Sequence, residues 1–300
     1  MRLLLALAFI GFAGCATAPA SLQATTETPL LISAEALVQR LGEDNLVVIH
    51  VVRDADTFDD GHIPGARLLS FSAIATERNG APNVLPDLEA VQSSFEAIGV
   101  SDDSHVVLYG DMGGLAAARA LYALDEIGHP TTSVLDGGLE AWRRAGGDVS
   151  TDAVEIVERG AMTFRPRLTV TARAEEMFEL LGYAEAGGAV IVDARPYAHY
   201  TGETPGGGVE RPGHIPPAVS LYWQEDLQPD GTLRPLAELQ ERYAAAGATP
   251  GTSVVAYCRT GVQASHTYLV ARLLGLNPRL YDGSYFEWSN QTDYPVEAGP

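Results

Sequence analysis

The chain has 300 residues, which is too long for one ordinary domain core and fits two domains of typical size. Its formal net charge of −20 excludes nucleic acid and anionic lipid surfaces as partners, because both attract a positively charged protein face. All 19 cationic side chains are arginines, so lysine nucleophiles, Schiff-base chemistry and Walker-A phosphate binding are excluded as well.

The first fifteen residues have the pattern of an export signal: one arginine, a short apolar stretch, and small residues that end at Cys15. The last four, Phe-Ala-Gly-Cys, are similar to a bacterial lipobox, in which the cysteine is lipidated and becomes the mature N-terminus. Phenylalanine is unusual at the first lipobox position, so ordinary cleavage nearby is the alternative. We expect residues 1–15 to be a lipoprotein-type signal peptide and residues 16–29 a disordered tether. The mature protein is then periplasmic, in a bacterial cell envelope, with the lipid anchor as its one membrane contact.

Short β-branched runs alternate with helical patterns between residues 30 and 149. Strands are predicted at residues 47–52, 106–109 and 133–135. A helix is predicted at residues 87–98, because its apolar side chains recur at helical spacing. Residues 150–168 contain Gly160 and Pro166 and lack a core pattern, so we expect them to connect two domains.

The same alternation returns in residues 169–300. Strands are predicted at residues 190–193, 254–257 and 279–281. A helical pattern follows Pro235, a residue suited to a first helical turn. The order of elements in this half matches that of the first half.

Sequence motifs recur as well, in the same order and at nearly constant spacing. GHIPGA around His62 returns as GHIPPA around His214, and LDGGLEAW, which ends at Trp142, returns as YDGSYFEW, which ends at Trp288. The sequence therefore predicts a duplicated α/β domain, each copy a parallel sheet with crossover helices on both faces. Since the two histidines are repeated, we expect them to bond the local backbone, and we expect both tryptophans to anchor the core.

The segment with the clearest chemistry passes through Cys258. A buried strand is expected to end at Tyr257, a six-residue turn to begin at Cys258, and a helix to continue to about Leu274. In open α/β sheets, ligands bind at the carboxyl ends of strands. There, the amides of the turn and the positive end of the helix would both stabilise an anionic sulfur. If Cys15 carries the anchor, Cys258 is the only thiol of the mature chain and has no disulfide partner within it.

Three other interpretations of Cys258 are less favourable. A free cysteine is most often a small apolar core residue, but a glycine-bearing turn between strand and helix argues against that role. A tyrosine-phosphatase-like loop needs an arginine six residues after the cysteine, where this chain has Ala264. A zinc site needs further soft ligands, and only His266 lies near, at unsuitable spacing. We therefore predict a nucleophilic cysteine and no metal.

From about residue 30 to residue 290 the chain resembles the two-domain rhodaneses, a family of thiosulfate and 3-mercaptopyruvate sulfurtransferases. The resemblance rests on the loop Cys-Arg-Thr-Gly-Val-Gln-Ala from Cys258, the GHIP turns, the DGG...W segment and the Asp-Ala-Arg segment from Asp193. It implies tandem rhodanese-like domains at residues 30–149 and 169–300, the second of them catalytic. It also implies a Cys258 persulfide that takes sulfur from a small-molecule donor and passes it to cyanide or a thiol, without metal or organic cofactor.

The resemblance also assigns substrate-binding residues. They are Arg259, Thr260, Gly261, Val262, Gln263, Arg195 and His199. Gln263 replaces the threonine usual in the family. Arg195 has two interpretations, contact with substrate or an ion pair with a neighbouring carboxylate such as Asp193. His199 stands where some relatives carry a substrate-binding arginine, so we expect the anion site to be weaker or to depend on pH.

The first copy departs from the pattern of the second. It has Gly110 and Asp111 in place of Cys258 and Arg259, and Val51 in place of Asp193, so we expect it to be catalytically silent and to wall the active-site cleft.

Arg259 favours thiosulfate as the sulfur donor, since a doubly charged anion gains most from an added cation, and relatives that use mercaptopyruvate tend to have Cys-Gly-Ser-Gly here. Two alternatives stay open: a 3-mercaptopyruvate sulfurtransferase, and a sulfur-carrier or binding module without turnover.

Overall fold

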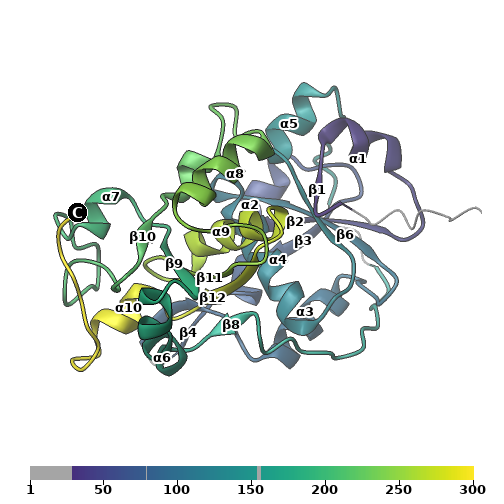
Figure 1. Cartoon of the computed structure of the whole chain (residues 1–300). Coiled ribbons are helices and arrows are strands. Elements are labelled where there is room, and N and C mark those ends of the chain that lie inside the picture. The colour runs from purple at the N-terminus through teal and green to yellow at the C-terminus, as the bar shows by residue number, and fades with distance from the viewer. Residues whose placement is uncertain (1–28, 79, 154–156) are drawn as a thin grey trace, which may run out of the picture.

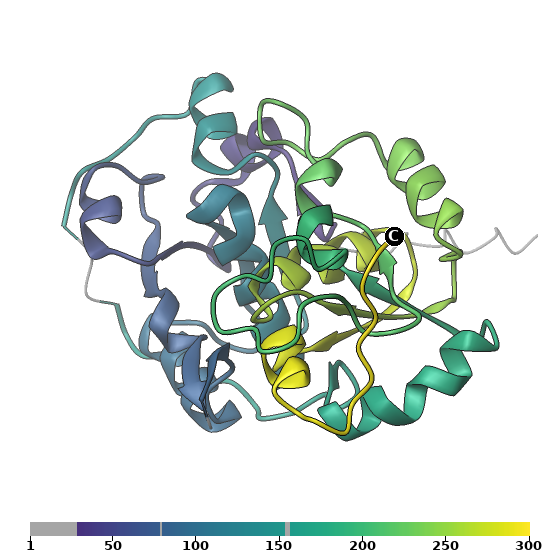
Figure 2. The same ribbon diagram turned by 90° about the vertical axis from the view of Figure 1, so that its left-hand side faces the viewer.

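The computed structural model describes residues 29–78, 80–153 and 157–300. The predicted signal peptide, the predicted lipidation site Cys15 and the predicted tether up to residue 28 lie outside these ranges. Within them, no helix combines the length and apolarity needed to cross a membrane. The two halves of the chain lie side by side, the first in purple to teal and the second in green to yellow (Figure 1, Figure 2).

The first half is built on a five-stranded sheet with all neighbouring strands parallel, in the order β1-β7-β6-β2-β3. Its strands are β1 (Leu31–Ile32), β2 (Leu46–Val52), β3 (Arg67–Ser70), β6 (His105–Gly110) and β7 (Thr132–Leu135), and a separate antiparallel hairpin is formed by β4 (Thr76–Arg78) and β5 (Ala81–Val84). Its helices are α1 (Ala34–Arg40), α2 (Ala55–Asp59), α3 (Leu88–Ala97), α4 (Leu115–Ile127) and α5 (Gly138–Arg144), with 3-10 turns η1 (Phe71–Ala73) and η2 (Met112–Gly114).

The second half repeats this plan with the sheet order β8-β12-β11-β9-β10, again entirely parallel. Its strands are β8 (Thr171–Ala172), β9 (Ala189–Asp193), β10 (Val219–Ser220), β11 (Ser253–Tyr257) and β12 (Asn277–Tyr281). Its helices are α6 (Ala174–Glu185), α7 (Tyr197–Tyr200), α8 (Leu236–Ala245), α9 (Val262–Leu273) and α10 (Ser284–Ser289), with the 3-10 turn η3 (Trp223–Asp226). The equivalent strand orders confirm the duplication and the α/β fold class predicted from the sequence.

Helices cover both faces of each sheet because side chains along a strand alternate between its faces. In β2, Val47, Ile49 and Val51 belong to the core under α3 and α4, whereas Val48 and Val52 belong to the core under α1, α2 and α5. Both faces of the sheet are thus buried. This explains why the strands read as continuous apolar runs rather than as alternating patterns.

The predicted strands of both halves lie inside observed ones and differ from them by at most two residues at an end. The edge strands β1, β3, β8 and β10 and the β4–β5 hairpin were not predicted, since they are short and partly exposed and lack a continuous buried apolar run. The predicted connection is irregular where it is described, and it runs along the first half: Gly160 donates to the carbonyl of Glu96 and Arg167 to that of Glu126. The exact domain boundaries stay predictions.

The repeated histidines and tryptophans have the structural roles expected of them. The Nδ1 atoms of His62 and His214 lie 3.0 Å from the carbonyl oxygens of Phe58 and Tyr200, and each imidazole stacks on the same residue's ring at 3.8 Å. The two tryptophans are almost fully buried, and each donates its indole N–H to a backbone carbonyl. The duplicated turns therefore serve the fold.

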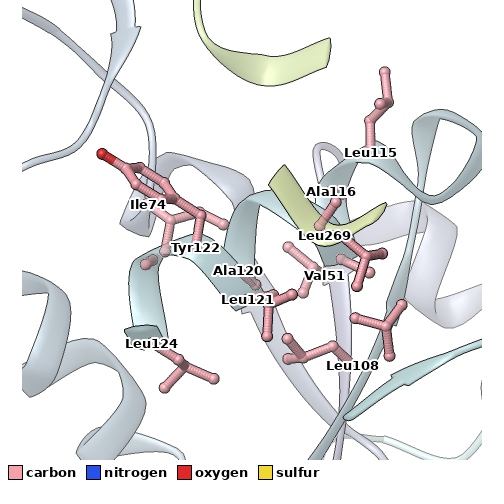
Figure 3. Packing of buried hydrophobic residues seen from close by; sticks show 14 of the residues in the cluster. Val51, Ile74, Leu108, Leu115, Ala116, Ala120, Leu121, Tyr122, Leu124 and Leu269 are labelled. Atoms are coloured by element: carbon pink, nitrogen blue, oxygen red, sulfur yellow. The ribbon is translucent and has the colours of Figure 1, made fainter. Parts of the chain in front are cut away.

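The two halves meet through α4 and α9, the helices that follow the central strands β6 and β11. All thirteen residues of α4 are buried, which is typical of a helix enclosed by protein on every side. Figure 3 shows Ala116, Ala120 and Leu121 of α4 beside Leu108 of β6, with Leu269 of α9 packed in the same cluster. This shared core holds the halves together and fixes the cleft between them.

Candidate active site

Cys258 directly follows β11, the central strand of the second sheet, at its carboxyl end. The residue is 1% exposed, yet it lines a pocket of about 470 Å³ that residues of both halves form. The thiol therefore lies at the inner end of the pocket rather than on the outer surface. A small molecule that fills this pocket would contact it.

The backbone around Cys258 is oriented by α10. The carbonyl oxygens of Cys258 and Arg259 accept hydrogen bonds from the amides of Tyr285 and Phe286, both at 2.9 Å. In a trans peptide the N–H points opposite to the C=O, so the amides of Arg259 and Thr260 point away from α10. Neither amide has a partner among the residues that the structure describes, which leaves both free for an anion.

The turn itself is shorter than predicted. It spans Cys258 to Gly261 and not six residues, because α9 begins at Val262. Gly261 has a φ of +82°, and a β-carbon there would lie 2.9 Å from the backbone oxygen of Asp282. Only glycine suits this left-handed, crowded position, and it reverses the chain into the helix within four residues.

The pocket is positively charged, although the chain as a whole is strongly acidic. Three arginines line it, Arg53, Arg195 and Arg259, and no carboxylate of the described residues does. Val262, Gln263, His199 and Thr260 also line it, so all the predicted substrate-binding residues except Gly261 face the same space as Cys258. Such a pocket selects anions.

The three arginines differ in how they are held. The guanidinium of Arg195 is buried, forms a two-pronged ion pair with Asp193 and donates to the carbonyl of Gly213. Burial opposes its charge, but the carboxylate outweighs that effect and raises the pKa of Arg195. Arg259 is exposed and donates to the carbonyl of Gly207 at 3.0 Å. The ion pair predicted as one interpretation of Arg195 is thus present, and Arg259 keeps an unneutralised charge.

The first half supplies pocket residues that sequence reasoning missed. Arg53, Phe71, Asn83 and Met112 line the pocket, and the side-chain amide of Asn83 donates to the hydroxyl oxygen of Thr260 at 3.0 Å. No local motif marks Phe71, Asn83 or Met112, and the sequence offered Arg53 only as the counterpart of Arg195 in the first copy. The sequence predicted that the first half would line one side of the cleft, but it did not indicate which residues would do so.

The buried ion pair of Arg119 and Asp282 packs against the Cys258 turn at Gly261. The guanidinium of Arg119 on α4 lies 2.6 Å from Asp282, which follows β12, and it also donates to the carbonyl of Asn83. Asp282 in turn accepts from the amide of Leu85 at 2.7 Å. A β-carbon at Gly261 would lie within 3.2 Å of both partners of this pair, so the turn rests directly on the contact between the halves.

The equivalent turn of the first half has no room for a side chain at the position of Cys258. A β-carbon on Gly110 would lie 2.4 Å from the backbone oxygen of Val51, so no larger residue fits there without a shift of the strand. A larger pocket of about 640 Å³ lies beside this turn, but Asp111, Asp136 and Glu140 are among its lining residues. An anionic sulfur donor is therefore better matched to the pocket at Cys258.

Comparisons with known proteins agree with this geometry. The family model of the rhodanese-like domain matches residues 33–145 and 177–291. The chain belongs to the rhodanese-like family. Its two matched segments lie within the two halves described above, and Cys258 belongs to the second of them.

Curated relatives and a solved structure show which rhodanese-like proteins this chain is similar to. A thiosulfate sulfurtransferase of Corynebacterium glutamicum is 33% identical over 90% of this chain and 90% of its own length. The sulfur carrier protein TtuD of Thermus thermophilus is 30% identical over 90% of this chain and 97% of its own. A structure of an EanB variant with ergothioneine linked to a persulfide cysteine has a TM-score of 0.77 and 27% identity, covering 90% of this chain and 70% of that one. This rhodanese-like protein is thus similar to sulfurtransferases along nearly its whole length.

No group of metal-ligating side chains suited to an ion occurs among the described residues. The site combines Cys258, the free amides of Arg259 and Thr260, and the three arginines of the pocket. A polarisable nucleophile next to fixed positive charge can attack an anionic electrophile and hold the product covalently.

Proposed function

We propose that this rhodanese-like protein moves sulfane sulfur from thiosulfate to cyanide or a thiol through a persulfide on Cys258. The observation that carries the proposal is the pocket at the end of β11, where the thiol shares one space with three arginines and with no carboxylate of the described residues. Thiosulfate is a small dianion whose outer sulfur is electrophilic, and it suits both the charge and the size of this pocket.

In the first displacement, the anionic sulfur of Cys258 attacks the outer sulfur of thiosulfate. A bond forms between the two sulfurs, the sulfur–sulfur bond of thiosulfate breaks, and sulfite leaves with the electron pair. The free amides of Arg259 and Thr260 and the guanidinium of Arg259 stabilise the charge that moves onto the departing group. The product is a persulfide at the inner end of the pocket.

In the second displacement, the nucleophilic acceptor attacks the outer sulfur of the persulfide. The bond to Cys258 breaks, its electron pair returns to the cysteine sulfur, and thiocyanate or a new persulfide leaves. The same amides and the amino end of α9 stabilise the returning negative charge. The sulfane sulfur carries the oxidising equivalents from donor to acceptor, so no further oxidant or reductant is needed.

Two alternative functions would use the same cysteine. The likeness to TtuD supports a sulfur carrier that loads Cys258 and discharges only to a partner. A 3-mercaptopyruvate sulfurtransferase would use the same cysteine and also take an anionic donor. Arg259 favours thiosulfate, because its exposed guanidinium adds positive charge for a dianion.

We also propose a periplasmic location in a bacterial cell envelope, with a lipid anchor at Cys15. It is supported by the export-signal pattern and the lipobox-like Phe-Ala-Gly-Cys that ends at Cys15. Labelling with a radioactive fatty acid, in the wild type and in Cys15→Ser, tests the anchor. Label in both proteins would contradict it.

The enzymatic proposal is tested by thiocyanate formation from thiosulfate and cyanide, comparing the wild type with Cys258→Ala. Saturable turnover that disappears in the variant supports the thiosulfate sulfurtransferase. Loading of sulfur without turnover supports the carrier, and turnover with 3-mercaptopyruvate alone supports the second alternative. Equal activity of the two proteins would exclude Cys258 as the nucleophile.

A further inference from the structure

Arg53 is the arginine of the Cys258 pocket that belongs to the first half. It follows β2 and is exposed, and its guanidinium has no hydrogen bond or ion pair with any of the residues that the structure describes. Arg195, its counterpart in the second half, is buried and tied to Asp193 at two points. Two copies of one sequence position thus carry one neutralised and one unneutralised cation in the same pocket.

The difference follows from two substitutions between the copies. In the second half, Asp193 accepts from both the backbone amide and the guanidinium of Arg195. In the first half His50, and not Val51 as predicted, occupies that place, because His50 pairs with Tyr109 of β6 as Asp193 pairs with Tyr257 of β11. No carboxylate is therefore available there to hold the side chain of Arg53. Asp111 accepts from the backbone amide of Arg53 instead, at 3.0 Å. The backbone is therefore anchored while the guanidinium stays available.

Asp111 shows that the first half contributes a positioned charged side chain to the pocket, in addition to closing one side of it. It stands where the second half has Arg259, next to Gly110, where no side chain fits at the position of Cys258. Its carboxylate accepts a hydrogen bond from the backbone amide of Arg53. This contact fixes the backbone that carries Arg53 at the edge of the pocket that contains Cys258. Through this hydrogen bond, the turn of the first half positions an arginine in the pocket of the Cys258 turn.

We propose that Arg53 binds the anionic end of the sulfur donor, so that the silent half supplies a specificity-determining residue for the reaction at Cys258. The inference rests on the proposed function. Arg259 and Arg53 approach the pocket from different halves, and a dianion between them gains two charge-assisted contacts. Arg53 and Arg259 are the two arginines of this pocket that have no carboxylate partner among the described residues, whereas Arg195 is paired with Asp193.

The test measures thiocyanate formation at varied thiosulfate in the wild type, Arg53→Gln, Arg53→Lys and Arg143→Gln. Arg143 is a matched control, because it is exposed on the first half, pairs with Glu140 at 2.8 Å and does not line the pocket. Each glutamine variant removes one positive charge from the surface. We expect the KM for thiosulfate to rise about tenfold in Arg53→Gln with kcat within about twofold, since one charge-assisted contact is lost from substrate binding.

Two further readouts separate substrate binding from a structural role. Arg53→Lys should recover part of the KM, and the dependence of KM on salt should be weaker in Arg53→Gln than in the wild type. A KM for Arg53→Gln equal to that of Arg143→Gln would overturn the inference and leave the proposed function standing. A fall in kcat at unchanged KM would overturn it too. Absence of sulfur transfer in the wild type would instead overturn the proposed function itself.

Discussion

Arg119→Ala should destabilise the protein by about 3–5 kcal/mol, the cost of removing one partner of a buried ion pair. The guanidinium of Arg119 is fully buried and lies 2.6 Å from Asp282, whose side chain is 13% exposed. The same group donates to the carbonyls of Asn83 and Ile74, and each lost hydrogen bond costs about 1 kcal/mol. After the change, Asp282 retains only the amide of Leu85 as a described partner.

Urea denaturation of the wild type and the variant measures this loss. Arg143→Ala is the control, because its ion pair with Glu140 is exposed and such pairs contribute about 0.5 kcal/mol or less. Arg119→Ala should also load less sulfur from thiosulfate at temperatures where it is folded, since the pair supports Gly261. A destabilisation within about 1 kcal/mol of the control would refute the reasoning that this contact holds the two halves and the turn together.

Gly261→Ala should lower the free energy of unfolding by about 1–2 kcal/mol because of its left-handed backbone, and by more because of the contact with Asp282. It should also load sulfur poorly. Gly251→Ala, with a φ of +87° and open space around it, is the control and should show only the backbone loss in the same urea denaturation assay. Glu126→Gln should be stabilising by about 2–3 kcal/mol at high pH, because burial raises the pKa of Glu126 to about 7 from an ordinary 4.5 and one carboxylate oxygen has no described partner. That gain should fade as pH drops from 7 towards 4.5, where the wild-type carboxyl is protonated, and a gain independent of pH would contradict the assignment.

The sequence was sufficient for the fold because the information is local and repeated. Every strand of four or more residues except β3 and β5 was predicted, since β-branched runs stand out between turn residues, and the duplicated motifs paired each element with its counterpart. The length of the Cys258 turn was not predictable from composition. It depends on Gly261 adopting a left-handed conformation against Asp282, a residue that is near only in the folded chain.

The pocket residues of the first half could not be predicted from the sequence for the same reason. Arg53 and Asn83 join the pocket only because α4 and α9 pack together and bring one half against the other. Arg195 and Arg53 look alike in the sequence, but Arg195 pairs with the carboxylate of Asp193, whereas His50 holds the equivalent strand position in the first half. Contacts between domains carry no sequence period, so a pattern cannot reveal them.

The most direct test of the account is the mass of the mature protein after incubation with thiosulfate and removal of excess reagent. We predict one added sulfur atom, located on the peptide that contains Cys258, removed by cyanide and absent in Cys258→Ala. An unchanged mass, or an added sulfur that persists in Cys258→Ala, would contradict a persulfide at this cysteine.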